Sequence, residues 1–167
     1  YAQLQAVDSR IAAKKPRTLD FAQAAALPLT AITAWETLFD RLDVNKPVAG
    51  GANVLLLIGG AGEVGSLAIQ FLKKLTDIQV IATASRPQSE VWLRRLGADY
   101  VINHRYSLPE QVAALGIGAP SWAFSTNHSA HYLPQLAELL APQGRIALID
   151  DPAALDANPL KGKSISL

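Results

Sequence analysis

Short apolar runs alternate with amphipathic runs through most of the chain. Residues 54–58 read Val-Leu-Leu-Leu-Ile without a polar break, which is typical of a strand buried on both faces of a parallel sheet. Between such runs, apolar residues recur at helical spacing. The predicted strands are 54–58, 80–84, 100–102, 122–124, 145–149 and 164 onward; the predicted helices between them are 63–75, 88–96, one opened by Ser107, and 131–140.

This alternation predicts an α/β fold in which repeated βαβ units form a doubly wound parallel sheet with helices on both faces. Two helices are expected before the first strand. Asp20 followed by Gln23 forms a capping-box pattern in the first of them, and apolar residues at helical spacing predict the second over residues 30–42. Pro- and Gly-rich turn residues fill 45–51.

The first 18 residues have a different pattern. Polar and apolar residues alternate over 1–7, as in a half-buried antiparallel strand, and a basic connector follows. The sequence contains no hairpin partner for such a strand. We therefore interpret residues 1–18 as the end-piece and connector of a truncated β-rich domain, and 19–167 as an α/β domain truncated in its last strand.

Composition narrows the classes of function. The chain has 167 residues and a net charge of +1, which gives no reason to expect nucleic-acid binding. No apolar run reaches the length of a membrane span. The sequence starts at Tyr1 and contains no Met, so we expect a processed chain or an excised piece of a longer protein. A cytoplasmic location is the default expectation.

The absence of cysteine removes disulfides, thiolate nucleophiles and Cys-based zinc sites from these residues. His128 and His131 have a metal-ligand spacing, but we interpret them as loop and helix-start surface residues. No bound metal is predicted for this chain.

A glycine-rich loop follows the first buried strand and opens an amphipathic helix, which is the setting of a dinucleotide-binding fingerprint. Gly60 is expected to allow the tight turn, Gly62 the close approach of a pyrophosphate, and Gly65 close packing of helix on strand. Backbone amides at the helix start, including those of Glu63 and Val64, favour phosphate binding, while the Glu63 side chain is expected to face solvent. A glycine-rich turn without a ligand is the alternative. The loop reads Gly60-Ala61-Gly62-Glu63-Val64-Gly65.

The end of the second predicted strand indicates which dinucleotide binds. NAD sites usually place an acid there to accept hydrogen bonds from the ribose, whereas this chain has Ser85 and Arg86, and no acid before Glu90. A hydroxyl and a guanidinium suit a 2′-phosphate, which predicts NADP(H). After the third strand, His104 and Arg105 supply further donors. The alternatives are a solvated Arg86 and ordinary polar loop residues at 104–105.

Polar residues also follow the fourth and fifth predicted strands, at the edge where such sheets bind ligands. Ser125 is a candidate cofactor contact. Asp150 and Asp151 form an acidic pair, but Pro152 follows them, so we predict a turn or cap rather than acid–base chemistry.

Residues 21–35, the loop at 60–65 and residues 97–103 together resemble the medium-chain dehydrogenases/reductases, most closely the quinone oxidoreductases and zinc-type alcohol dehydrogenase-like proteins. The resemblance covers nearly the whole chain. It implies a Rossmann-type nucleotide-binding domain joined to a short piece of a truncated GroES-like catalytic domain.

The resemblance has further implications. Thr30 matches a family threonine that packs near the nicotinamide, and a helix-capping role for it is compatible. The family's quinone reductases often reach the 2′-phosphate with a Lys and a Tyr, where this chain has Ser89 or Glu90 and His104. A homodimer through the strand near Leu167 is implied. Zinc in relatives depends chiefly on the other domain.

The sequence therefore predicts the NADP(H)-binding domain of an oxidoreductase that moves a hydride between the nicotinamide and a carbonyl, alcohol or quinone/enone substrate. No catalytic residue is identified, and the chain alone is expected to bind cofactor with little turnover. Two alternatives are a non-catalytic dinucleotide sensor and an S-adenosylmethionine-dependent methyltransferase, although Ser85 and Arg86 argue against the latter. The expected partners are the cofactor and a small-molecule substrate.

Overall fold

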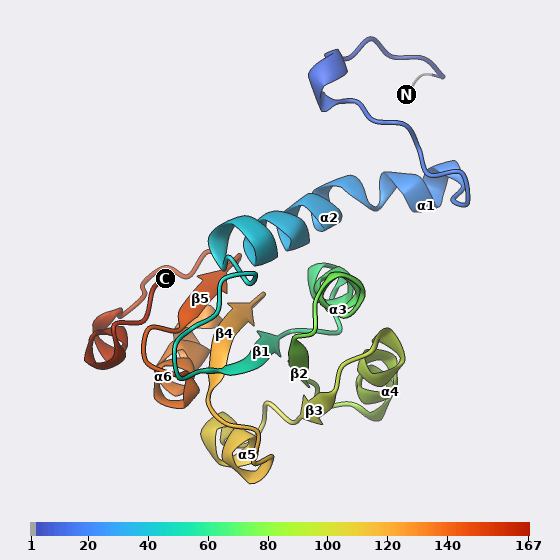
Figure 1. Ribbon diagram of the computed structural model, residues 1–167. Helices are drawn as coiled ribbons and strands as arrows, with labels where there is room; N and C mark the ends of the chain where they lie inside the picture. Colours follow the sequence, from blue (N-terminus) through green and yellow to red (C-terminus); the bar gives the residue numbers. More distant parts are fainter. Residues whose placement is uncertain (1–2) are drawn as a thin grey trace.

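The computed structural model describes residues 3–167 and contains one parallel sheet with helices on both faces (Figure 1). Within these residues the sheet has five strands in the order β3-β2-β1-β4-β5, and every neighbouring pair is parallel. The predicted Rossmann-type α/β fold is confirmed. The strands are β1 (Ala52–Ile58), β2 (Gln79–Thr83), β3 (Tyr100–Ile102), β4 (Pro120–Ser125) and β5 (Arg145–Leu148).

The helices divide between the two faces of the sheet. Helices α2, α3 and α4 contribute to one core cluster, whereas α5 and α6 contribute to the other. Three short helical segments, η1 to η3, lie outside these layers or extend them. Helix bounds are α1 (Phe21–Ala25), α2 (Pro28–Trp35), α3 (Glu63–Leu75), α4 (Pro87–Leu96), α5 (Leu108–Ala114) and α6 (Ser129–Leu139), with η1 (Ser9–Ile11), η2 (Glu36–Arg41) and η3 (Asn158–Lys163).

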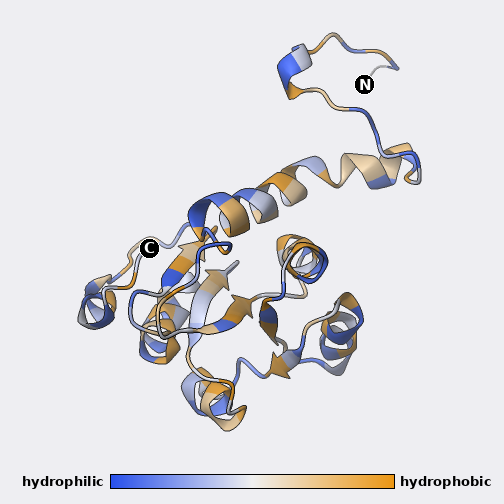
Figure 2. Cartoon of the chain, in the orientation of Figure 1, coloured by the Kyte–Doolittle hydropathy of each residue, from blue (hydrophilic) through white to orange (hydrophobic). Residues whose placement is uncertain are grey.

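Strand β1 lies at the centre of the sheet and is buried on both faces. Leu55 and Leu57 pack into the cluster under α3, while Val54, Leu56 and Ile58 pack into the cluster under α6. Because successive side chains of a strand point to opposite faces, an unbroken apolar run supplies both cores at once. The hydropathy colouring shows the same apolar centre (Figure 2).

Capping residues mark the ends of several helices. The side chains of Asp20 and Gln23 form the predicted capping box of α1. Gly97 adopts φ +105° and ends α4, and Ser107 accepts a hydrogen bond from the Glu110 amide at the start of α5. Helix α3 has the predicted bounds, and α6 begins at Ser129, two residues earlier than predicted.

The helix predicted over residues 30–42 begins earlier and changes geometry. Pro28 occupies its first turn, where a missing N–H costs nothing. After Trp35 the helix continues as the π-helical segment η2, which ends with the Leu42 amide donating to the Thr37 carbonyl at 2.9 Å.

The strand predicted over residues 1–7 is not formed within residues 3–7, and residues 1–2 lie outside the described part. The segment instead extends away from the sheet with its side chains exposed, and η1 interrupts it (Figure 1). An alternating pattern needs a neighbouring strand to hydrogen-bond with, and residues 3–167 provide none there. The assignment of residues 1–18 to another domain stays a prediction.

The sixth strand predicted from Ser164 onward is reduced to one parallel bridge. Ser166 pairs with Arg145, with the Ile146 amide donating to the Ser166 carbonyl at 2.8 Å. The left-handed residue Ser164 ends η3 two residues before the bridge, so extended pairing starts only near the end of the chain that the structure describes. The homodimer expected through this segment stays a prediction. In the part of the chain that the structure describes, no helix is both long and apolar enough to cross a membrane.

Arg145 ties the segment before β1 to the sheet. Its guanidinium donates to the carbonyls of Leu42 at 2.6 Å, Asp43 at 2.7 Å and Lys46 at 2.9 Å. These carbonyls lie in the turn after η2, so the side chain closes the end of that helix onto β5.

Replacing Arg145 with Met should lower the free energy of unfolding by about 2 kcal/mol, because three hydrogen bonds from a charged donor are lost and the partly buried Leu42 carbonyl loses its donor. Chemical denaturation measures this. Arg95→Met on the exposed side of α4 is the control, since the described contacts give Arg95 no hydrogen bond; equal losses in both variants would contradict the role given to Arg145.

Candidate functional site

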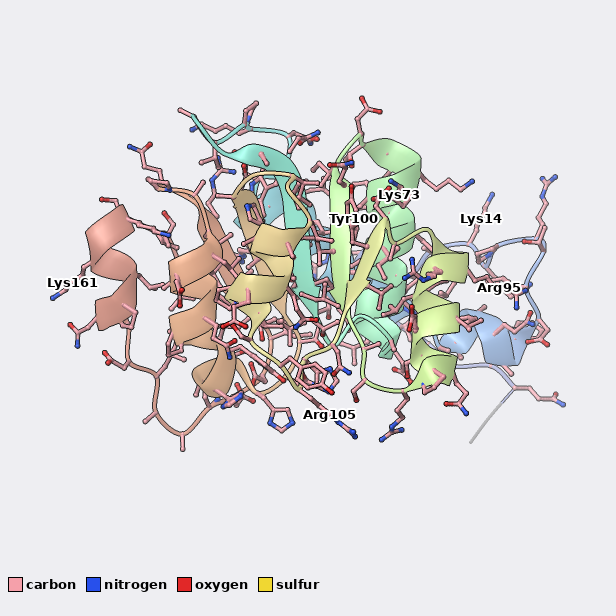
Figure 3. All side chains as sticks on the ribbon, turned by 90° about the horizontal axis from the view of Figure 1, so that it is seen from below. Lys14, Lys73, Arg95, Tyr100, Arg105 and Lys161 are labelled. Atoms are coloured by element: carbon pink, nitrogen blue, oxygen red, sulfur yellow. The ribbon has the colours of Figure 1, made fainter. Side chains whose placement is uncertain are left out.

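A pocket of about 310 Å³ opens at the edge of the sheet where β1, β2, β3 and β4 end. Figure 3 shows Arg105 at this edge, just beyond β3, and Tyr100 at the other end of the same strand. Such carboxyl ends are where open α/β sheets bind ligands. The lining residues are Ile58, Gly59, Ala61, Gly62, Thr83, Ala84, Ser85, Arg86, Ser89, His104, Thr126, Asn127, His128 and Tyr132.

The tight turn out of β1 is made by Gly59 and not, as predicted, by Gly60. Gly59 has φ +74°, a conformation that side chains disfavour, whereas Gly60 does not have a positive φ. A Cβ on Gly60 would lie 3.0 Å from Leu93 and 3.1 Å from Ala82, so this glycine serves close packing. Two adjacent glycines are indistinguishable by residue type, and the path of the chain decides which one turns.

Gly65 has the predicted packing role. A Cβ at this position would lie 2.6 Å from the Cα of Gly60 and 2.7 Å from the carbonyl oxygen of Gly59. The first turn of α3 therefore rests directly on the backbone that leaves β1. Both near neighbours are backbone atoms, so they have little freedom to move aside.

The start of α3 is open toward the pocket. Gly62 is the N-cap residue, and within the described chain no side chain caps it. An added Cβ there would have only the Gly59 carbonyl within 4 Å, at 3.4 Å. Glu63 is exposed and Val64 packs against the first core cluster, and neither side chain lines the pocket. Contact between their backbone amides and a ligand stays a prediction.

The far wall of the pocket carries the residues predicted from the end of the second strand. Ser85 is half-buried, Arg86 is exposed, and both line the pocket together with Ser89 and His104. Among the described residues that line it, none is acidic. Glu90, the first acid after β2, instead accepts hydrogen bonds from Arg94 on α4, at 2.9 Å and 3.1 Å. This wall is therefore positively charged.

His104 is the titrating group of the wall. Partial burial, and then the nearby charges of Arg105 and His128, hold the pKa of His104 below its ordinary value of 6.5. The imidazole is therefore neutral at pH 7 and able both to donate and to accept a hydrogen bond.

The end of β4 offers different residues from the one predicted. Ser125 is fully buried, with its hydroxyl 3.2 Å from the Asn127 carbonyl and 2.8 Å from the Ser129 hydroxyl, so it does not line the pocket. Thr126, Asn127 and His128 line it instead. The signal in the sequence that points to them is strand alternation, because the inward-facing Ser125 is followed by residues that leave the sheet. A cofactor contact of Ser125 stays a prediction.

Asp150 has the capping role that the sequence predicted. Its carboxylate accepts hydrogen bonds from the amide of Ser129, at 2.9 Å, and from the Ser129 hydroxyl, at the start of α6. Burial acts to raise the pKa of Asp150, but the hydrogen bonds from Ser129 and the nearby His128 together hold it below its usual value. A carboxylate at a helix N-terminus also interacts favourably with the helix dipole.

His128 and His131 are exposed at the start of α6, as predicted, and His128 adopts a left-handed φ of +52°. Residues 3–167 contain no group of three His, Cys, Asp or Glu side chains arranged to hold a metal ion. That this chain binds no metal stays a prediction.

Thr30 lies apart from the pocket lining. It is buried on α2, and its hydroxyl donates at 3.3 Å to the carbonyl of Ala26, the residue that ends α1. The structure thus shows that Thr30 hydrogen-bonds to the end of the preceding helix, and its proximity to a nicotinamide stays a prediction.

Comparison with known proteins gives a consistent result. The sequence profile of the zinc-binding dehydrogenase family matches residues 64–167. A zinc-type alcohol dehydrogenase-like protein of Staphylococcus epidermidis is 38% identical over 166 residues, which is 98% of this chain and 49% of that protein. An NADPH-dependent alkenal/one oxidoreductase of Arabidopsis thaliana is 43% identical over 104 residues, 62% of this chain and 25% of that protein.

Among solved structures, a zinc-dependent alcohol dehydrogenase candidate from Rhizobium etli CFN 42 superposes with a TM-score of 0.93 at 57% identity. The match covers 96% of this chain and 47% of that one. The chain spans about half the length of the curated relatives that match it along its whole length.

Replacing Gly65 with Ala should lower the free energy of unfolding by about 2 kcal/mol or more and weaken dinucleotide binding, because the methyl group would separate α3 from the end of β1. Chemical denaturation and ligand titration measure both effects. Gly162→Ala is the control, since a Cβ there meets nothing within 4 Å. If Gly65→Ala had the stability and dinucleotide affinity of the wild type, the close contact between α3 and the end of β1 would be refuted.

Stability should also depend on His104 at mildly acidic pH. The folded state protonates His104 less readily than the unfolded chain, so this residue's contribution to stability is lost as pH falls below 6.5. When the pH is lowered from about 7.5 to about 5.5, the free energy of unfolding should fall more for the wild type than for His104→Gln, as measured by chemical denaturation. The two proteins share all other titrating groups. If their free energies of unfolding changed equally with pH, the linkage to His104 would be excluded.

Proposed function

Because the chain belongs to the zinc-binding dehydrogenase family, within the medium-chain alcohol dehydrogenase and quinone oxidoreductase superfamily, and is its nucleotide-binding half, we propose that it binds NADP(H) for a hydride-transfer enzyme. The substrate class is a carbonyl, alcohol or quinone/enone compound. When bound, the cofactor supplies the hydride from its nicotinamide ring.

The residues of the pocket suit a dinucleotide. The uncapped start of α3 offers backbone amides and the positive end of the helix dipole to a pyrophosphate. Gly62 leaves space for phosphate oxygens to approach the backbone. The tasks of this chain are therefore to bind and orient the cofactor, and to desolvate its phosphates against the end of the sheet.

The observation that carries the choice of NADP(H) is the composition of the wall after β2. Ser85, Arg86 and Ser89 line it with His104, and Glu90 is paired with Arg94. A guanidinium can bind a 2′-phosphate through two parallel hydrogen bonds, and hydroxyls can add further donors. The Arabidopsis relative is named as an NADPH-dependent enzyme, which supports the same choice.

In the intact protein, cofactor binding is proposed for this domain, and substrate binding and catalysis for a second domain. The matched relatives are about twice as long as this chain, which supports the proposal that substrate contacts and catalytic residues lie in another domain. The described pocket contains no nucleophile paired with a base. Chain 1–167 alone is therefore expected to bind cofactor with little turnover.

Replacing Arg86 with Ala should weaken NADPH binding about tenfold or more and leave NADH binding nearly unchanged, because a charged hydrogen bond to the 2′-phosphate is lost. Calorimetric titration with both cofactors measures this, and Arg95→Ala, near the other end of the helix that Arg86 precedes, is the control. A wild-type preference for NADH would overturn the choice of NADP(H), and failure to bind either cofactor would overturn the proposed function.

A further inference from the structure

Side-chain hydrogen bonds join the ends of three strands beside the pocket. Two residues after the end of β5, Asp150 accepts hydrogen bonds from the amide and hydroxyl of Ser129 at the start of α6. Ser129 in turn contacts the buried hydroxyl of Ser125 in β4 at 2.8 Å. One residue on, the Thr126 hydroxyl donates to the Ile58 carbonyl at the end of β1, at 3.0 Å. The chain of contacts thus runs from the residues that follow β5 to the last residue of β1, just before the glycine-rich loop.

The segment between these contacts is short and conformationally demanding. Only Thr126, Asn127 and His128 separate β4 from α6, and all three line the pocket. His128 has φ +52°, which costs free energy for a residue with a side chain and persists only where the surroundings enforce it. Ser129 directly follows His128, so its bonds to Asp150 restrain the strained end of the segment.

We infer that Asp150 is a positioning residue for nucleotide binding: through Ser129 it holds the segment from Thr126 to His128 in the pocket wall. The inference rests on the proposed function, since that function makes the pocket a dinucleotide site. Asp150 itself is outside the pocket lining. Its action is therefore on the shape of the wall and not on the ligand directly.

Charge alone and a positioning role predict opposite changes in nucleotide affinity when Asp150 is removed, so the direction of the change tests the inference. The pocket is proposed for an anionic ligand, so removal of a nearby carboxylate should by charge alone tighten binding. Removal of a residue that positions the wall should weaken it. Asp151 provides the matched control because it is the adjacent acid, is exposed, and has no hydrogen bond among the described contacts.

The experiment compares NADPH titrations of the wild type, Asp150→Ala, Asp150→Asn, Ser129→Ala and Asp151→Ala. The Asp150→Ala and Ser129→Ala variants should bind about tenfold more weakly. Asp150→Asn, which still offers an oxygen to the Ser129 amide, should recover most of the affinity, and Asp151→Ala should equal the wild type or bind slightly more tightly. Unchanged or tighter binding by Asp150→Ala would overturn the inference, as would equal losses in the Ala and Asn variants.

Amide hydrogen exchange without ligand gives a second measurement that does not depend on the proposed function. Exchange over residues 126–132 should accelerate in Asp150→Ala and not in Asp151→Ala, while the rest of the sheet keeps its protection. Uniform acceleration throughout the protein would indicate general destabilisation and overturn the positioning role. If the wild type fails to bind NADPH, the proposed function fails, and this exchange result still decides whether Asp150 orders the segment.

Discussion

The direct contact between the first turn of α3 and the end of β1 is the constraint on which the pocket depends. Because a Cβ at Gly65 would lie 2.6 Å from the Cα of Gly60, only a helix without a side chain there can start so close to the strand. That closeness aims the uncapped N-terminus of α3 at the edge of the sheet. The resulting group of amides, with the helix dipole, is suited to bind phosphate.

The topology then assembles the remaining walls. The chain passes from β3 at one edge to β4 on the other side of β1, so helices before and after this crossing cover opposite faces. The ends of β1 and β4 therefore border a crevice at the topological switch point. Nearby acids are engaged elsewhere: Glu90 pairs with Arg94, and Asp150 binds Ser129. The crevice is left with Arg86 and donors on its wall.

Local patterns were sufficient for most elements. The apolar run in β1, the amphipathic face of α3 and the caps at Asp20 and Gly97 each depend on residues within one or two turns of one another. The prediction of a strand over residues 1–7 was wrong for residues 3–7, because it relied on a local pattern alone. Its alternation is a local property, but strand formation needs a hydrogen-bonding partner that the described residues do not supply there.

The sequence by itself determined the alternation of strands and helices, the glycine spacing and the residue types after β2, because periodicity and motif spacing are properties of neighbouring positions. Only the tertiary structure decided that Gly59 makes the turn, that Thr126 faces the pocket in place of Ser125, and that α6 is the helix that Asp150 caps. Each of these depends on the register and approach of segments far apart in the chain. The positions of these segments relative to one another follow from the packing of the whole sheet, so they cannot be predicted from a short stretch of residues.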